Sequence, residues 1–191
     1  EALSPGGAPV TVALAPKTSA GQAGLLYEGH DYAALGAAAD YCLLMTYEWG
    51  YAYSAPMAVS PIPKIRQVLD YAVTAIPAKK LLLGISSYGY DWPLPYTQGK
   101  TRARSIGCQQ AITIAREHGA EIFFDEAAQA PYFRYTAEGR AHEVWFEDAR
   151  SIRAKLGLAA QYGLAGVGYW NLMRPFPQNW QVLDALCRIR R

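Results

Sequence analysis

Aromatic residues stand beside acidic or amide residues at three places in this 191-residue sequence, and each place follows an apolar run. The three segments are Thr46-Tyr47-Glu48-Trp49, Tyr88-Gly89-Tyr90-Asp91-Trp92 and Tyr169-Trp170-Asn171. An aromatic ring stacks on the apolar C–H face of a pyranose, while carboxylates and amides bind its hydroxyl groups. This combination of residue types favours a carbohydrate ligand, and a polysaccharide is the natural substrate.

Packing is the alternative explanation for any one of these side chains. A Tyr or Trp can fill space beneath a loop, and Met45, in an apolar run directly before Thr46, is typical of a core residue. The coincidence of aromatic residues at three strand ends is harder to explain by packing alone. Both interpretations stay open for each residue at this point.

The sequence gives little support for a metal site, a disulfide framework or a nucleotide-binding site. His30, His118 and His142 are isolated, with no metal-ligand spacing, and we expect structural or surface roles for them. The three cysteines are odd in number and widely spaced, which disfavours a disulfide framework or a zinc site. The sequence contains no GxxxxGK[ST], and no GxGxxG follows an apolar run, so the nucleotide-binding signatures are missing.

Two pairs of adjacent carboxylates, Asp125-Glu126 and Glu147-Asp148, cannot jointly flank one bond because sequence neighbours point apart. We expect them to be helix caps or solvated charges. Asp148 and Ser151 suit the start of a helix, whose outward face would carry Arg150, Arg153 and Lys155.

The composition predicts a globular domain with a sizeable core, since 51% of residues are hydrophobic, 13% are aromatic and 18% are charged. The formal net charge is +2 and there is no basic stripe before the last few residues, so we expect no nucleic-acid partner. The longest nearly uncharged stretches fall well short of the roughly 18 apolar residues that a membrane span needs. We therefore expect no membrane partner either.

Four short apolar runs predict buried parallel strands, each followed by a segment with helical spacing. The strands are expected at 10–15, 41–47, 80–86 and 165–170, and the helices near 30–39, 63–76, 147–162 and 180–189. This is an α/β pattern, and such repeats either close into a barrel or remain an open sheet. Periodicity alone does not decide between the two.

About 80 residues separate the third apolar run from the fourth, which indicates an insertion. Residues 96–144 form the predicted α+β module, with strands near 102–106, 121–124, 131–136 and 142–146 and a helix near 108–118. The predicted organisation is therefore βα units in 1–95, the insertion in 96–144, and the last helix-strand-helix units in 145–191.

Several motifs together resemble the second half of a glycoside hydrolase family 18 domain, and in particular its spore-cortex-lytic branch, which often carries LysM modules. They are Leu14-Ala-Pro-Lys-Thr-Ser19, Leu43-Leu-Met-Thr-Tyr-Glu-Trp49, Leu83-Gly-Ile-Ser-Ser-Tyr-Gly-Tyr90, Val144-Trp-Phe-Glu-Asp-Ala-Arg-Ser151 and Gly166-Val-Gly-Tyr-Trp-Asn171. The resemblance implies the C-terminal half of a (β/α)8 TIM barrel, strands five to eight. The α+β insertion would lie between the seventh strand and its helix.

The resemblance also implies a mechanism and the roles of individual residues. In this family the substrate's own 2-acetamido oxygen attacks the anomeric carbon while a glutamic acid protonates the leaving oxygen. Tyr47 matches the tyrosine that binds the acetamido group, Trp170 matches the floor of the subsite and Met45 matches a residue beneath that sugar. Glu48 stands where many chitinases have Asp and would be an electrostatic or hydrogen-bonding partner. Weaker matches by position imply sugar contacts for Trp49, Tyr88, Tyr90, Trp92 and Asn171, and no metal or organic cofactor is implied.

One departure from the family is an absence: the catalytic signature DxxDxDxE occurs nowhere in residues 1–191. We expect this stretch to supply the second half of a site that acts on N-acetylglucosamine-containing polysaccharide such as peptidoglycan or chitin, and to be inactive alone. The alternative is a non-catalytic, lectin-like protein with the same cleft. The resemblance implies a spore, cell-wall or extracellular location, and self-association or pairing with an N-terminal half-barrel would cover the unpaired strand edges.

Overall fold

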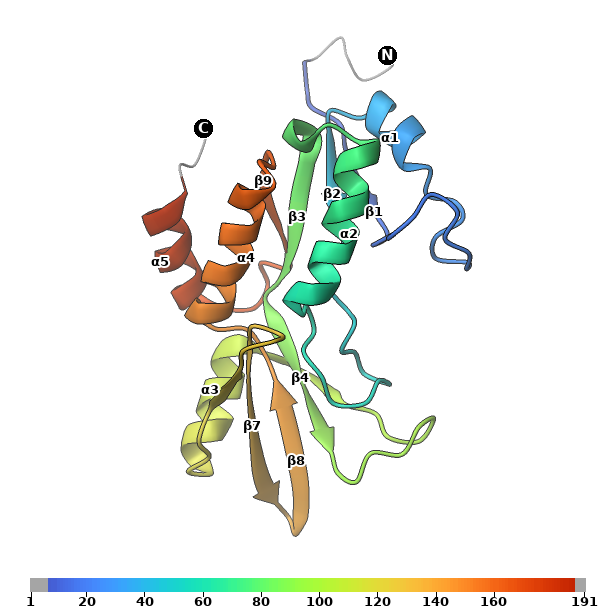
Figure 1. Cartoon of the computed structure of the whole chain (residues 1–191). Helices are drawn as coiled ribbons and strands as arrows, with labels where there is room; N and C mark the ends of the chain where they lie inside the picture. The colour runs from blue at the N-terminus through green and yellow to red at the C-terminus, as the bar shows by residue number, and fades with distance from the viewer. Residues whose placement is uncertain (1–6, 188–191) are drawn as a thin grey trace. The chain divides into compact units, whose positions relative to one another are not determined.

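The computed structural model describes residues 7–187, which divide into two compact units (Figure 1). The first unit comprises residues 7–46, 64–85 and 157–168, and the second comprises 47–63, 86–156 and 169–187. Each unit contains one β-sheet, and each is described by itself.

The first unit is built on a four-stranded sheet in the order β1-β2-β3-β9. The strands are β1 (Thr11–Leu14), β2 (Tyr41–Leu44), β3 (Leu81–Ser86) and β9 (Gly166–Trp170). β1 pairs parallel with β2, and β2 pairs parallel with β3. The four predicted strands are confirmed, although β2 ends at Leu44, three residues earlier than its predicted end at residue 47.

Helices α1 (Tyr32–Ala38) and α2 (Ile62–Ala75) and the 3-10 helix η2 (Ala78–Lys80) connect these strands. α2 is amphipathic: Ile65, Val68 and Leu69 have no exposed surface, whereas Lys64, Arg66 and Asp70 face solvent. This spacing by three and four residues buries one stripe of the helix. Figure 1 shows α2 lying alongside β3, with its chain running in the opposite direction to that of the strand.

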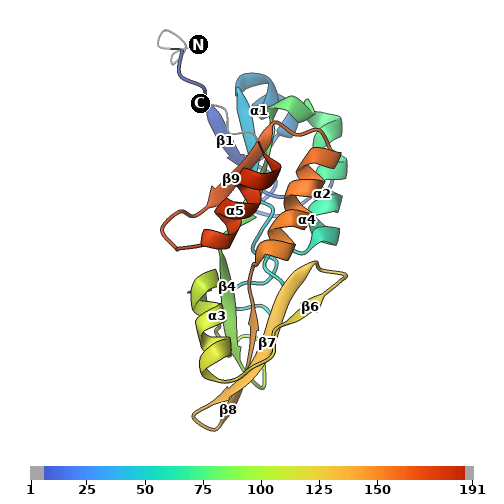
Figure 2. The same ribbon diagram turned by 90° about the vertical axis from the view of Figure 1, so that its left-hand side faces the viewer.

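The second unit is built on a five-stranded antiparallel sheet in the order β5-β4-β8-β7-β6. The strands are β4 (Tyr88–Pro93), β5 (Arg104–Gly107), β6 (Phe123–Asp125), β7 (Ala130–Ala137) and β8 (Arg140–Trp145). The unit also holds α3 (Cys108–Glu117), the first half of α4 (Ala149–Gln161) and α5 (Pro177–Leu186). Figure 2 shows α3 alongside β4.

The helix and the four strands predicted within residues 96–144 are observed as α3 and β5 to β8, but strand β4 was not predicted. Sequence reasoning treats residues 88–92 only as the end of the preceding strand, whereas they pair with β5 and β8. The alternation of Tyr88, Tyr90 and Trp92 with Gly89 and Asp91 is the period of two that such a strand requires. α5 begins at Pro177 rather than near 180, and the end of that predicted helix lies outside the described residues.

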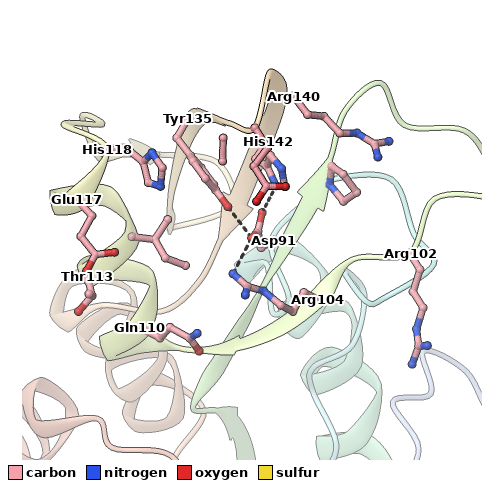
Figure 3. A pocket seen from close by; sticks show the side chains of 14 residues that line it. Asp91, Arg102, Arg104, Gln110, Thr113, Glu117, His118, Tyr135, Arg140 and His142 are labelled. Carbon is pink, nitrogen blue, oxygen red and sulfur yellow. Dashed lines mark hydrogen bonds and ion pairs between the residues drawn. The ribbon is translucent and has the colours of Figure 1, made fainter.

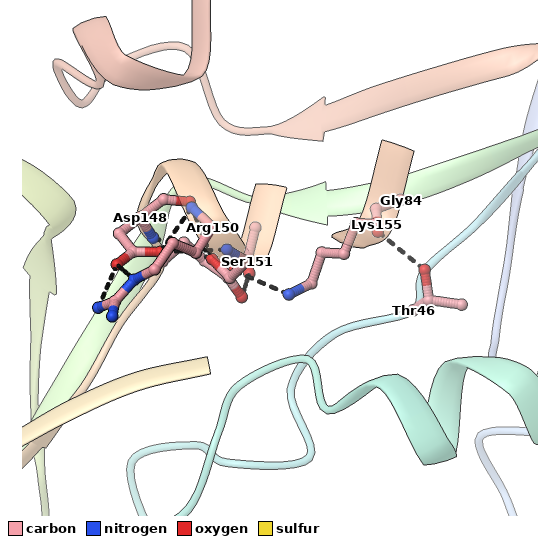
Figure 4. A network of polar contacts seen from close by, with 8 residues as sticks. Thr46, Gly84, Asp148, Arg150, Ser151 and Lys155 are labelled. Atoms are coloured by element: carbon pink, nitrogen blue, oxygen red, sulfur yellow. Dashed lines mark hydrogen bonds and ion pairs between the residues drawn. The ribbon is translucent and has the colours of Figure 1, made fainter. Parts of the chain in front are cut away.

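The start of α4 confirms one expectation and corrects two others. Asp148 Oδ1 accepts from the Ser151 N–H at 3.1 Å, and Ser151 Oγ accepts from the Asp148 N–H at 2.9 Å, which is a reciprocal cap. Glu147 and Lys155 were expected in solvent but are 1% and 0% exposed, and they form an ion pair of 2.8 Å (Figure 4). Burial raises the pKa of the Glu147 carboxyl, and the Lys155 ammonium opposes that shift. Two charges can be buried here because each neutralises the other.

Candidate functional site

Glu48 is the centre of a polar cluster in the second unit. Tyr90 Oη donates to its carboxylate at 2.9 Å and 3.2 Å from the two oxygens, and Tyr88 Oη makes a short hydrogen bond to Glu48 Oε1. The two tyrosines are 5% and 7% exposed. Two hydrogen bonds from buried hydroxyl groups hold the Glu48 carboxylate in one orientation, because turning it would break at least one of them.

Strand β4 explains why the two tyrosines act together. Residues two apart on a strand project from the same face, so Tyr88 and Tyr90 lie side by side. Their ring centroids are 5.8 Å apart with an edge-to-face angle of 84°. Gly89 between them approaches β8 so closely that a Cβ there would lie 2.2 Å from the Trp145 carbonyl oxygen. The glycine is thus required for the pairing that sets the two rings.

The segment after β2 places the Glu48 carboxylate beside the hydroxyl groups of Tyr88 and Tyr90. Glu48 has a φ of 70°, in the left-handed region that costs a non-glycine residue about 1 kcal/mol or more. The following backbone is anchored, because Trp49 N donates to Val59 O at 3.1 Å and Gly50 N donates to Ala58 O at 3.0 Å. A Cβ at Gly50 would lie 2.2 Å from the Met57 carbonyl oxygen. The chain therefore holds an unfavourable backbone conformation in order to aim one carboxylate.

Tyr47 completes what we call the Glu48 cluster: Tyr47, Glu48, Tyr88 and Tyr90. Burial raises the pKa of Tyr47, and the charge of Glu48 raises it further. Burial, the hydrogen bond to Glu48 and the charge of Glu48 raise the pKa of Tyr88 well above its usual range, and the same three causes act on Tyr90. All three hydroxyls stay protonated donors at neutral pH. Among the described residues no side-chain hydrogen bond is made by Tyr47, which is half-buried.

The end of β9 lies beside the start of β4. Ser87 N donates to the Trp170 carbonyl oxygen at 3.1 Å, and Ser87 Oγ donates to the Asn171 carbonyl oxygen at 2.5 Å. Trp170 is 56% exposed, and Asn171 Oδ1 accepts from Met173 N at 3.1 Å. Trp170 is thus hydrogen-bonded to the residue that precedes Tyr88, and its exposed indole is a surface on which a sugar ring can stack.

Arg174 is a site residue that sequence reasoning missed. Its guanidinium lies over the Tyr88 ring, 5.7 Å from the centroid, and its Nη1 donates to Ser105 Oγ at 3.0 Å. In the sequence Arg174 is simply a basic residue three positions after Asn171, and no motif or spacing marks it as a site residue. Arg174 adds a positive charge next to the Glu48 cluster.

The remaining predicted site residues occupy different environments. Trp92 has no exposed surface and its Nε1 donates to Ser54 O at 2.7 Å, while Trp49 is half-buried. Met45 lies in the first unit, just after β2, where its N–H donates to Leu14 O at 2.9 Å. Across residues 7–187 the structure places no group of three or more His, Cys, Asp or Glu side chains that could hold a metal ion. Within the same residues no helix is both long and apolar enough to cross a membrane.

Comparisons with known proteins show which proteins the chain is similar to. A family model described as glycosyl hydrolases family 18 matches residues 7–174. The chain is 56% identical over 179 residues to the cortical fragment-lytic enzyme of Bacillus subtilis, covering 93% of this chain and 42% of that protein. The structure of the Bacillus cereus spore cortex-lytic enzyme SleL superposes with a TM-score of 0.93 at 43% identity, covering 96% of this chain and 43% of that one. A chitinase from Chromobacterium violaceum matches with a TM-score of 0.86 at 31% identity, over 96% of this chain and 56% of that one. The chain thus spans less than half the length of the curated relative it matches.

Proposed function

The chain belongs to family 18 of the glycosyl hydrolases, and from this premise we propose that it supplies part of the active site of a glycosidase that cleaves N-acetylated glycan in spore-cortex peptidoglycan. The Glu48 cluster carries the proposal. It combines a carboxylate held by two hydroxyl donors with a tyrosine hydroxyl, and the exposed Trp170 at the end of β9 adds a ring surface, which together are groups that an acetamido sugar needs. The relatives named for cortex lysis support the choice of polymer.

The proposed mechanism is substrate-assisted and retains the anomeric configuration. The Tyr47 hydroxyl binds the 2-acetamido group and turns its carbonyl oxygen towards the anomeric carbon. As that oxygen attacks, positive charge develops on the oxazolinium ring, and the Glu48 carboxylate stabilises it electrostatically. Tyr88 and Tyr90 are positioning residues, since they fix Glu48 without touching the reacting atoms. No metal or organic cofactor enters this scheme.

Trp170 is the proposed stacking surface beneath the sugar, with Asn171 and Trp49 as further contacts, and the role of Met45 stays a prediction from the resemblance. Trp92 has a different role in this proposal: its fully buried ring supports the Glu48 cluster from the core of the second unit. The acid that protonates the leaving oxygen lies outside residues 1–191, because this stretch has no DxxDxDxE. We therefore expect residues 1–191 alone to bind glycan without cleaving it.

The finer architecture is also a proposal. The sheet β1-β2-β3-β9 would be the last four strands of a (β/α)8 barrel, with 1–95 and 145–191 contributing its βα units. Residues 96–144, joined by β4, would be an insertion between the seventh strand and its helix. The spore or cell wall is the corresponding location, and an N-acetylglucosamine-containing polysaccharide is the corresponding partner.

The experiment that tests this function compares two substrates for the protein that contains this chain. N-acetylglucosamine oligomers should be cleaved, whereas the same oligomers with free 2-amino groups should not, because only the acetamido oxygen can act as nucleophile. Tyr47→Phe should lower the turnover of the acetylated substrate by about 10- to 100-fold, the effect of removing one hydrogen bond at the reacting group. Equal cleavage of both substrates, or full activity in Tyr47→Phe, would contradict the mechanism.

A further inference from the structure

One cationic side chain, that of Arg174, lies beside both tyrosines that hold Glu48. Its guanidinium lies over the Tyr88 ring, 5.7 Å from the centroid, and its Nη1 donates to Ser105 Oγ at 3.0 Å. Ser105 lies opposite Tyr90 across strands β5 and β4. A single side chain thus reaches one tyrosine directly and the other through its cross-strand neighbour.

The Arg174 side chain runs along strand β5. Gly107 lies opposite Tyr88, and a Cβ at that glycine would lie 3.7 Å from both Cβ and Cδ of Arg174. The aliphatic stem therefore lies against Gly107, and the guanidinium reaches Ser105, two residues earlier in the same strand. Residues two apart on a strand project from one face, and paired residues share a face, so this path follows the face that carries Tyr88 and Tyr90.

Hydrogen bonds hold the backbone directly before Arg174. Ser87 N and Oγ donate to the carbonyl oxygens of Trp170 and Asn171, and Met173 N donates to Asn171 Oδ1 at 3.1 Å. Ser87 is itself the residue before β4. The segment that carries Arg174 is therefore fixed to the strand that carries the two tyrosines.

Arg174 has a different environment from Arg104, the neighbour of Ser105 in β5. Arg104 points to the other face of the sheet, where its Nη2 pairs with Asp91 Oδ2 at 3.2 Å (Figure 3). In the part of the chain that the structure describes, no acidic side chain forms an ion pair with Arg174. Its contacts are instead with the tyrosine pair and with Ser105.

The charge of Arg174 makes both tyrosines better donors. A cation over an aromatic face attracts the π electrons of the ring, which leaves the Tyr88 hydroxyl proton more positive. Burial and Glu48 raise the pKa of Tyr90, and the positive charge of Arg174 and a hydrogen bond with Ser105 oppose that rise. Both effects strengthen the hydrogen bonds that the two hydroxyls donate to Glu48.

We propose that Arg174 is a positioning residue for the Glu48 carboxylate, acting on it through Tyr88 and, by way of Ser105, through Tyr90. The inference rests on the proposed function, in which Glu48 stabilises the positive charge of the oxazolinium ring. That charge develops only as the acetamido oxygen attacks, so a better-held carboxylate favours the transition state over the bound substrate. Arg174 therefore serves turnover rather than glycan binding.

Steady-state kinetics of the protein that contains this chain, with an N-acetylglucosamine oligomer, test this role. Arg174→Met should lower kcat about tenfold and leave KM within about twofold, the pattern of an interaction that matters only in the transition state. Arg174→Lys keeps a positive charge beside Tyr88 and should recover most of the loss. Arg150→Met removes an arginine that also lies over an aromatic ring, at 4.4 Å from the Phe124 centroid, and should change neither constant.

Two kinetic results would overturn the inference. A raised KM with an unchanged kcat would place Arg174 in contact with the substrate, and a lower melting temperature with both constants unchanged would give it a structural role only. Ser105→Ala provides a second variant: it should lower kcat by about threefold, and by less when Arg174→Met is also present, because the two residues act along one path. Full additivity of the two changes would contradict that path.

A further measurement does not depend on turnover. The carboxyl carbon of Glu48, observed by NMR in protein that contains isotope-labelled glutamate and assigned by its loss in Glu48→Gln, should shift in Arg174→Met. The signal should return towards its parent position in Arg174→Lys and stay in place in Arg150→Met. An unmoved Glu48 signal in Arg174→Met would overturn the inference whatever the kinetics. Failure of the proposed function would appear instead as an absence of acetylated-oligomer cleavage by the parent protein, which this signal does not report.

Discussion

The hydroxyl groups of Tyr88 and Tyr90 donate to the Glu48 carboxylate, and these two hydrogen bonds set the orientation on which its proposed chemistry depends. Burial and the negative charge of Glu48 both raise the pKa values of Tyr88 and Tyr90. Both hydroxyls therefore remain donors over the pH range in which a free tyrosine would begin to ionise. A carboxylate with two permanent donors keeps one orientation, which is what an electrostatic partner of a developing positive charge requires.

Glu48→Gln should lower the pKa values of Tyr88 and Tyr90, because it removes the charge that opposes their ionisation while leaving them buried. The measurement is tyrosinate absorbance as a function of pH, with Glu121→Gln as a control for loss of an exposed carboxylate. A folded-state pKa above the ordinary value of about 10 stabilises the folded protein below pH 10, and that stabilisation is lost as the pH rises towards the folded-state value. Identical alkaline titrations of the parent and Glu48→Gln would contradict the assignment.

At the scale of elements, the buried Glu147–Lys155 pair ties the segment before α4 to the middle of that helix. The two side chains are almost fully buried, and Ser86 Oγ also contacts Glu147 Oε1, at 3.4 Å. A buried pair contributes little net stability compared with apolar residues, but loss of one partner leaves an uncompensated charge.

Lys155→Met should therefore lower the free energy of unfolding by about 3–5 kcal/mol, measured by urea denaturation. Glu147→Gln combined with Lys155→Met should recover much of that loss, since no buried charge then remains. Arg153→Gln, an exposed change on the same helix, should alter stability by less than about 0.5 kcal/mol. If the single and double variants were equally unstable, charge compensation would not be the reason that these residues are buried.

The sequence predicted the elements that depend on local pattern and missed those that depend on distant pairing. The strands β1, β2, β3 and β9 follow from apolar runs, and α2 follows from spacing by three and four. Strand β4 and the burial of Lys155 depend on partners elsewhere in the chain. The contact of His142 with Asp91 joins residues 51 positions apart, so a histidine that looked isolated in the sequence gains this partner only through antiparallel pairing.

The candidate site could be predicted only in part, because some of its contacts also depend on pairing between distant segments. Tyr47, Glu48, Tyr88, Tyr90 and Trp170 were named because they follow apolar runs, and the structure brings the first four into one cluster. That Tyr88 and Tyr90 are donors to Glu48 could not be predicted without the path of β4. Arg174 had no pattern that would have named it.

For the whole molecule, the proposed half-barrel has a physical consequence at its sheet edges. Among the described residues, β1 is hydrogen-bonded on one side only, to β2, and it ends the sheet. An exposed edge offers unpaired N–H and C=O groups to another chain.

Residues 1–191 produced alone should therefore self-associate, which analytical ultracentrifugation would measure. Ala13→Lys places a charge at an exposed position of β1 and should reduce the association, whereas Ala127→Lys, an exposed change outside that strand, should not. A monomeric chain that unfolds in one cooperative transition would count against the half-barrel.

The central claim is that the Glu48 cluster and Trp170 form a sugar-binding site, and a fluorescence titration with the N-acetylglucosamine tetramer tests it most directly. Trp170→Ala should weaken binding by about 1–3 kcal/mol, or roughly 5- to 150-fold, the contribution expected of a stacked aromatic ring. Trp180→Ala, a change to a tryptophan that is 44% exposed on α5, should leave the affinity within twofold. Saturable binding that is lost only in Trp170→Ala is the result that this account predicts. Absence of binding in the parent chain, or equal affinity in the parent and both variants, would contradict it.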